Sequence, residues 1–319
     1  MREYGPGNPL VFSHIPKSAG TSLRAALAEA LQSGRVVYGV DRSLVAGYDN
    51  IDGLRGPARD NFIMSPDELP LDATLVTGHI SPGTTRARFP DADHVTTLRH
   101  PQLRVISQWT HGRALSDFDL RHFGGGTANA FRVARGSLKE YLFHDLIAPN
   151  VDNTIARFLA WPHPSLHPTR FIPEQDDDAI LEAAIESLER FAHVGVVEDE
   201  NFLGNLSDWL GRRLVETRLN ERTSMSRHRR PDLARELTPA THELLRHRTR
   251  LDTALWLHVA QRSMKQRSPQ DVLDAAWDVA LERYAKAAQA PHHERPVRRA
   301  VEIVYGWGSA VRGRRRPWN

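Results

Sequence analysis

Residues 10–27 read LVFSHIPKSAGTSLRAAL, and the rest of the predicted fold is arranged around this stretch. It opens with an apolar run, crosses a turn at residues 16–20, and continues into a helix with Leu23, Leu27 and Leu31 along one side. A strand, a small-residue turn and a helix N-terminus form an anion cradle, because the first N–H groups of the helix lack internal partners. The residues expected to form this phosphate loop are Lys17, Ser18, Ala19, Gly20, Thr21 and Ser22.

Lys17 places a mobile cation at the mouth of the phosphate loop. The chain contains 42 lysines and arginines, but its only lysines are Lys17, Lys139, Lys265 and Lys286. The compact ammonium group of lysine donates to a leaving oxygen more readily than a planar guanidinium does. Lys17 precedes Gly20, whereas the common nucleotide-binding pattern G-x-x-x-x-G-K-[ST] has its lysine after the glycines. The pattern therefore indicates a phosphate loop of another kind.

Composition sets broad limits on the function. The 319 residues are 40% hydrophobic and 25% charged, which is typical of a soluble globular protein. A net charge of +3 does not indicate a nucleic-acid partner. The absence of cysteine excludes disulfides, thiolate catalysis and cysteine-ligated metals. With no leader pattern at residues 1–9 and no apolar run long enough to span a membrane, the expectation is a cytoplasmic protein without a transmembrane segment.

Apolar segments alternate with helical patterns, which predicts an α/β fold with a central parallel sheet flanked by helices. After the first strand, further strands are expected at residues 35–40, 74–80, 94–98 and 193–197. Ligands of parallel sheets bind at the carboxyl ends of the strands. The phosphate loop, His79 and Arg99 each follow a strand, so one crevice is expected to hold all three.

The remaining segments are expected to be helices and loops in two domains. Helices are predicted at residues 102–115, 130–146, 153–160, 177–191, 201–213, 238–262 (as two helices) and 269–290. Loops are predicted at residues 43–72, 117–127 and 161–173. Residues 1–267 would form the main domain, and residues 268–319 a helical and basic C-terminal extension.

A second motif lies at residues 95–109, VTTLRHPQLRVISQW. Arg99 leaves a predicted strand, and Ser107 lies one or two turns into the helix that follows. A guanidinium fork and a hydroxyl donor together suit a phosphate group. This pair is therefore a second candidate anchor for a phosphorylated ligand.

The two motifs, in this order, resemble those of sulfotransferases that use 3′-phosphoadenosine-5′-phosphosulfate (PAPS). HIPKSAGTSL resembles the 5′-phosphosulfate loop of the carbohydrate-type branch, and RHP followed by RVISQ resembles its 3′-phosphate-binding element. The resemblance covers about residues 10–265. It implies a P-loop-kinase-like sulfotransferase fold, PAPS as the sulfuryl donor, no metal, and a hydroxyl acceptor on a carbohydrate or glycosylated metabolite.

The resemblance also implies a general base. In heparan-sulfate 2-O-sulfotransferase-like enzymes, a histidine in a similar G-H element between the two motifs is the proposed base, and the corresponding residue here is His79. Two alternatives stay open. His14 lies beside the phosphate loop, and other sulfotransferases use a glutamate, for which Glu68 is a candidate.

Later segments carry weaker signals. Residues 219–231, LNERTSMSRHRRP, are similar in position to the cofactor-covering loop of the family, which implies that Arg222 contacts the cofactor. Contact of this loop with an anionic acceptor is the alternative. Glu198, Asp252 and Trp256 occupy positions where the family commonly has acidic and aromatic residues. The arginine-rich segment 291–319 would associate weakly with an acidic partner, with a membrane surface or with the body of the protein itself. Two other functional classes, a nucleotide kinase or NTPase and a non-enzymatic polyanion-binding module, remain as alternatives, and the oligomeric state is open.

Overall fold

A parallel β-sheet forms the centre of the protein, as shown by a computed structural model that describes residues 3–32, 34–44, 57–120, 125–215, 231–264 and 267–289. The five strands are ordered β2-β3-β1-β4-β5, and every neighbouring pair is parallel. The strands are β1 (Leu10–Ser13), β2 (Val36–Val40), β3 (Leu75–His79), β4 (His94–Leu98) and β5 (His193–Val196). The prediction of an α/β fold with a central parallel sheet is confirmed.

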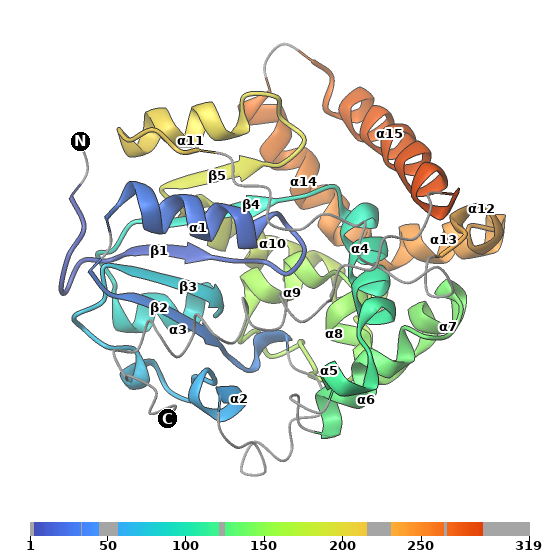
Figure 1. Cartoon of the computed structure of the whole chain (residues 1–319), viewed down its shortest axis with the longest axis horizontal. Coiled ribbons are helices and arrows are strands. Elements are labelled where there is room, and N and C mark those ends of the chain that lie inside the picture. The colour runs from blue at the N-terminus through green and yellow to red at the C-terminus, as the bar shows by residue number, and fades with distance from the viewer. Residues whose placement is uncertain are drawn as a thin grey trace.

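Helices flank this sheet on both sides (Figure 1). In the described residues they are α1 (Gly20–Ala30), α2 (Pro57–Asp60), α3 (Pro82–Arg88), α4 (Pro101–Ala114), α5 (Asp117–Leu120), α6 (Gly125–Val133), α7 (Leu138–Phe143), α8 (Ala148–Val151), α9 (Thr154–Ala160), α10 (Asp177–Glu189), α11 (Phe202–Leu210), α12 (Leu233–Glu236), α13 (Pro239–Arg248), α14 (Arg250–Ser263) and α15 (Pro269–Gln289).

Side chains of β1 point alternately to the two faces of the sheet, and different helices pack on each face. Leu10 and Phe12 pack in one hydrophobic cluster with α1 and α11, whereas Val11 packs in another cluster with Phe89 at the end of α3. Successive strand residues point to opposite faces, so both faces of this central strand are buried. Leu27 is fully buried against the first face, as its position in the sequence pattern predicts.

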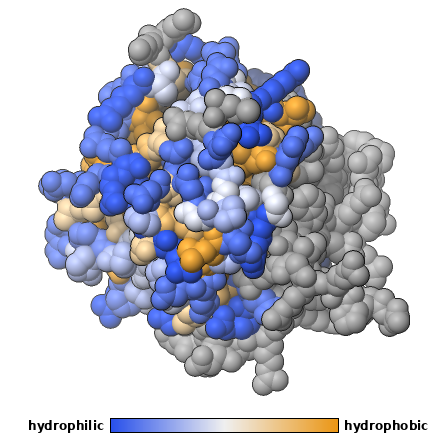
Figure 2. All heavy atoms as spheres, turned by 90° about the vertical axis from the view of Figure 1, so that its left-hand side faces the viewer, coloured by the Kyte–Doolittle hydropathy of each residue, from blue (hydrophilic) through white to orange (hydrophobic). Residues whose placement is uncertain are grey.

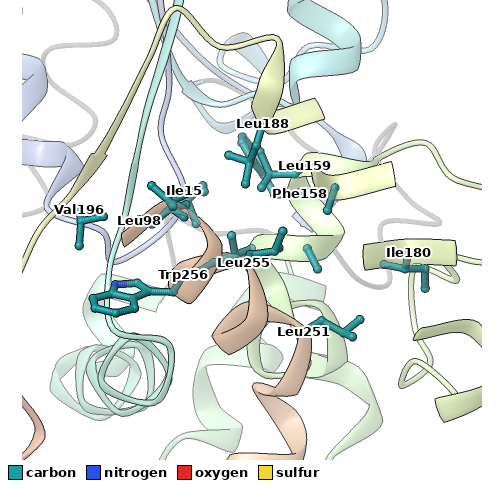
Figure 3. Close-up of a cluster of buried hydrophobic side chains, with 14 of the residues drawn as sticks. Ile15, Leu98, Phe158, Leu159, Ile180, Leu188, Val196, Leu251, Leu255 and Trp256 are labelled. Atoms are coloured by element: carbon teal, nitrogen blue, oxygen red, sulfur yellow. The ribbon is translucent and has the colours of Figure 1, made fainter. Parts of the chain in front are cut away.

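The largest core cluster lies beyond the carboxyl ends of the strands (Figure 3). Ile15, Leu98 and Val196, which follow or end β1, β4 and β5, meet Leu255 and Trp256 of α14 there. Burying each such side chain stabilises the fold by about 1.5–3 kcal/mol. Because Ile15 lies two residues before Lys17, this cluster anchors the chain just before the phosphate loop.

The helix α15 of the predicted C-terminal extension packs on the rest of the described structure. Val272 and Leu273 belong to the cluster around Trp256, and Ala280 and Tyr284 belong to a cluster with Trp109 of α4. A cavity of about 390 Å³ lies between α4, α13, α14 and α15. The boundary between residues 267 and 268 stays a prediction, and residues 290–319 lie outside the described residues.

Two predictions about the segment after α4 are wrong. The single helix predicted at residues 130–146 is divided into α6 and α7, because Ser137 forms a capping box with Glu140 and begins a new helix. The backbone N–H of Ser137 donates to Glu140 Oε2 over 2.8 Å. The loop predicted at residues 117–127 contains α5 and the start of α6, so two of its three consecutive glycines are helical.

The outer surface is mainly polar on the face at the left of Figure 1. Figure 2 shows hydrophilic residues over most of the described part of this face, with hydrophobic residues in small separate patches. None of the described helices is long and apolar enough to cross a membrane.

Candidate functional site

The phosphate loop connects β1 to α1 in a strained conformation. Lys17 has φ 68° and Ala19 has φ 60°, values that residues other than glycine rarely adopt. Ala19 occupies the N-cap position of α1 without a side-chain cap, and the first turn of α1 has no acidic residue. Within the described residues, no carboxylate of the first turn therefore covers the amides at this end, and they suit an anion.

Gly20 is required by the packing of His14 beneath α1. A Cβ atom at position 20 would lie 1.8 Å from His14 Cδ2, so no larger residue fits without movement of the ring. The imidazole of His14 is buried and stacks on Phe12, with ring centroids 5.6 Å apart. Burial, followed by the nearby His79 and Arg24, holds the pKa of His14 well below its usual value.

The end of β4 binds the phosphate loop directly. Arg99 Nη1 donates to the carbonyl oxygen of Lys17 over 3.0 Å, and Thr97 Oγ1 donates to the carbonyl oxygen of Ser18 over 2.8 Å. Arg99 and Lys17 are 82 residues apart in the sequence. The structure therefore brings the two sequence motifs into contact, with Ser107 half-buried on α4.

His79 is the last residue of β3 and follows a glycine with an unusual conformation. Gly78 has φ 130°, and a Cβ there would lie 2.0 Å from the carbonyl oxygen of Gly39 on β2. His79 Nδ1 donates to the carbonyl oxygen of His14 over 2.7 Å. A carbonyl only accepts, so Nδ1 carries the proton and Nε2 of the neutral ring keeps its lone pair. The two imidazole centroids are 4.6 Å apart.

The electrostatic surroundings keep His79 neutral. Burial lowers the pKa of His79 to about 4, the hydrogen bond to His14 opposes this change, and the charges of Arg24 and Lys17 add to it. At neutral pH the ring is therefore unprotonated and able to accept a proton at Nε2.

Asp41, which sequence analysis did not select, fixes the backbone around His79. Its backbone N–H donates to the carbonyl oxygen of His79 over 3.0 Å. Its buried carboxylate accepts at Oδ2 from the Ser81 backbone N–H and from Thr84 Oγ1, each over 2.8 Å. Asp41 directly follows β2, and its position after a predicted strand could have identified it from the sequence.

The ammonium group of Lys17 influences imidazoles on both sides of the loop. Its positive charge lowers the pKa values of His14 and His79, and it is the largest cause that lowers the pKa of His111 on α4 to about 3. The charge of Lys17 thus acts on histidines at the ends of β1 and β3 and on a histidine of α4. Sequence analysis did not select His111, because nothing local marks a histidine in the last turn of α4.

The late acidic residues form structural contacts. Glu198 accepts from the backbone N–H of His100 over 2.9 Å and from Trp256 Nε1 over 3.2 Å, and burial raises its pKa. Asp252 is fully buried and accepts from the backbone N–H of Ala156 over 2.9 Å; burial raises its pKa to about 6. These contacts connect β5, α4, α9 and α14 behind the site.

The other candidates are placed as follows. Glu68 lies on a 3₁₀ turn with its side chain exposed, and its carboxylate accepts from the backbone N–H of Met64 over 3.3 Å. Arg222 lies outside the described residues. Within the described ranges, no group of three or more His, Cys, Asp or Glu residues is placed to hold a metal ion.

Comparison with known proteins adds no family assignment. No protein-family model matches the chain, and no curated protein sequence matches it.

Proposed function

We propose that this protein is a PAPS-dependent O-sulfotransferase that acts on a carbohydrate or a glycosylated metabolite. The observation that carries the proposal is the contact between Arg99 and the Lys17 carbonyl, which joins two motifs that each suit one end of the same nucleotide. His79 ends the neighbouring strand β3, and the hydrogen bond at its Nδ1 leaves Nε2 available to accept a proton.

The topology supports a P-loop-kinase-like sulfotransferase fold. The central strand β1 leads into the phosphate loop and then into α1, and β3 and β4 lie on either side of β1. In parallel sheets a ligand binds where neighbouring strands connect in opposite directions, and β1 is such a position. In this order His79 ends β3 on one side of β1, and Arg99 follows β4 on the other side.

The residues at this edge of the sheet fit the phosphate groups of PAPS. The 5′-phosphosulfate would be held by Lys17 and by the amides and hydroxyls of Thr21 and Ser22, and the 3′-phosphate by Arg99 and Ser107. Ser18 Oγ supports this fit, because it is fully buried in the loop without a hydrogen-bond partner among the described residues.

When bound, PAPS supplies a sulfuryl group, whose sulfur bonds to the acceptor oxygen as its bond to the bridging phosphate oxygen breaks. His79 Nε2 accepts the proton of the acceptor hydroxyl. Lys17 and the amides of α1 stabilise the negative charge that develops at the loop, because they are oriented before the reaction begins. Positioning and charge stabilisation are the main contributions of a protein to group transfer of this kind.

The direct test is transfer of radiolabelled sulfate from PAPS to a panel of sugars and glycosylated metabolites. We expect His79→Ala to lower turnover by about 10²- to 10⁴-fold, the usual cost of losing a general base. Calorimetry should show that this variant still binds 3′-phosphoadenosine-5′-phosphate (PAP). His247→Ala, at a half-exposed position on α13, is the matched control and should retain turnover. Loss of PAP binding in His79→Ala would overturn the assignment of the base.

Ligand-induced stabilisation separates the proposal from the other two classes. PAP should raise the Tm, and ATP with Mg²⁺ should not, whereas a kinase or NTPase would show the opposite preference. A polyanion-binding module would show steeply salt-dependent binding to heparin without a nucleotide preference. That alternative depends on residues 222–230 and 295–316, which lie outside the described residues.

A further inference from the structure

Arg24, on the second turn of α1, is a buried cation without a hydrogen-bond acceptor among the residues that the structure describes. Only 9% of the residue is exposed. The other buried arginines in the described residues, Arg104, Arg157 and Arg248, each donate to a carbonyl or carboxylate oxygen. Arg24 makes no hydrogen bond and no ion pair with any described residue, and its contact is with the face of an aromatic ring.

The guanidinium of Arg24 belongs to the surroundings of the proposed base. Its Cζ atom lies 4.9 Å from the centre of the Tyr38 ring, and the edge of that ring meets His79 with centroids 6.3 Å apart. His79 in turn lies 4.6 Å from His14. Arg24, Tyr38, His79 and His14 therefore form one continuous series of contacts, which runs from α1 over the middle of β2 to the ends of β3 and β1. The positive charge of Arg24 also contributes to the lowered pKa of His79.

A buried charge without a counter-charge is unfavourable, because desolvation is not offset by an ion pair. Contact with the Tyr38 ring offsets part of this cost, since an aromatic face attracts a cation. No carboxylate is among the causes that shift the pKa of Arg24, which are burial and Tyr38. The missing partner is best supplied by an anionic ligand.

The position of Arg24 indicates which ligand this is. In the strand order β2-β3-β1-β4-β5, Arg99 follows β4, on one side of the phosphate loop. Tyr38, on which Arg24 stacks, belongs to β2, on the other side of the loop and beside His79. The acceptor hydroxyl must also lie beside His79, so Arg24 lies on the acceptor side of the site.

We propose that Arg24 binds an oxyanion of the acceptor, a carboxylate or a sulfate ester, and thereby directs the neighbouring hydroxyl to His79. This inference rests on the proposed sulfotransferase function for the hydroxyl, but the anion site itself is testable without turnover. The structure thus assigns an anionic acceptor in place of a neutral one.

The test is calorimetry with two sugars that differ in one group, methyl β-glucuronide and methyl β-glucoside, on protein with and without saturating PAP. Glucose 6-sulfate forms a third arm, which distinguishes a sulfate ester from a carboxylate. We expect the wild type to prefer the anionic sugars, and Arg24→Met to bind them about 10- to 100-fold more weakly, the usual effect of losing a charged hydrogen bond. Arg24→Met should also raise the Tm of the ligand-free protein, because the unpaired charge is removed.

Arg86→Met is the matched control. Arg86 stacks on Phe191 at 4.8 Å, but its guanidinium also donates to Ser187 Oγ and to the Ser187 carbonyl. This variant should lower the Tm and leave the binding of all three sugars unchanged. If the wild type binds the charged and neutral sugars equally, or if Arg24→Met keeps the preference, the inference is wrong. Failure of PAP to bind would contradict the proposed function alone, since the titrations without PAP test Arg24 separately.

Discussion

The carbonyl oxygen of His14 determines which nitrogen of His79 is available for chemistry. Because Nδ1 donates to that carbonyl, Nε2 is the accepting nitrogen of the neutral ring. Sequence analysis predicted His79 as the base and left His14 open. In the structure, His14 is buried against Gly20 and His79 is half-buried at the strand end, which favours His79 as the residue that an acceptor reaches.

The lowered pKa of His79 predicts the pH dependence of the reaction. The base must be neutral, and a pKa of about 4 keeps it neutral at higher pH. We therefore expect kcat/KM for PAPS to stay constant as the pH falls from about 8 to about 5 and to decrease only near pH 4. Circular dichroism at each pH should verify that the protein remains folded. A decrease centred near pH 6.5, the value of an unperturbed histidine, would contradict the assignment.

Arg99 is expected to have two effects when it is removed. Arg99→Ala loses a donor for the 3′-phosphate and also the hydrogen bond to the Lys17 carbonyl. We expect the affinity for PAP to fall by about 10- to 100-fold, and the affinity for adenosine 5′-phosphate to fall much less. Arg267→Ala removes an exposed arginine that pairs with Glu200, and it should change neither affinity. If Arg99→Ala still prefers PAP over the monophosphate, Arg99 does not bind the 3′-phosphate.

The residues that sequence analysis missed can be recognised only from their contacts in the folded structure. Lys17, Arg99 and His79 were predicted from their positions after strands, and the structure places them at one edge of the sheet. Arg24 and His111 lie within α1 and α4, where a single basic residue is ordinary. Arg24 packs on Tyr38 of β2, and the pKa of His111 is lowered by the charge of Lys17. Both partners are distant in sequence, so no local pattern contains these contacts.

At the level of elements, the junction of β1 and α1 depends on the absence of a side chain at position 20. Gly20→Ala would place a Cβ 1.8 Å from the His14 ring, so we expect destabilisation by about 1–3 kcal/mol and loss of PAP binding. Gly204→Ala on α11 is the control, because nothing lies within 4 Å of its Cβ position. It should be neutral or stabilising by up to about 1 kcal/mol, since alanine favours helix. Urea unfolding measures both effects, and equal stabilities for the two variants would refute this explanation.

The bounds of elements were predictable where hydrophobic patterns are strong. The strand at residues 94–98 has the predicted bounds, and α10 and α15 differ from their predictions only at their ends. The division between α6 and α7 was missed although its signal, Ser137 three residues before Glu140, is local. The strand order required pairing information that periodicity does not contain, so sequence analysis predicted a parallel sheet without an order.

For the whole molecule, buried neutral histidines make stability depend on pH. Burial lowers the pKa values of His94 and His100 to about 4, and both residues are nearly inaccessible to solvent. Between pH 6.5 and 4 the unfolded chain binds more protons at these positions than the folded protein does. The stability they contribute is therefore complete above about pH 6.5 and is lost as the pH falls towards 4.

Urea unfolding at pH 7 and pH 5 tests this linkage. For each of the two histidines, the free energy of unfolding should be lower at pH 5 than at pH 7 by about 2 kcal/mol. His94→Gln keeps a polar group near the Ala92 carbonyl and Thr85 Oγ1, which His94 contacts, but does not titrate. The variant should therefore lose less stability between the two pH values than the wild type does. An identical loss in both proteins would contradict a buried, neutral His94.

The central claim is that one nucleotide spans two anchors, the phosphate loop at α1 and Arg99 at the end of β4. A crystal structure of the complex with PAP tests it most directly. We predict the 5′-phosphate within hydrogen-bond distance of the backbone amides of Thr21 and Ser22, and the 3′-phosphate on Arg99 and Ser107, with His79 Nε2 facing the 5′ end. PAP bound at another surface, or bound with its 3′-phosphate away from Arg99, would contradict the claim.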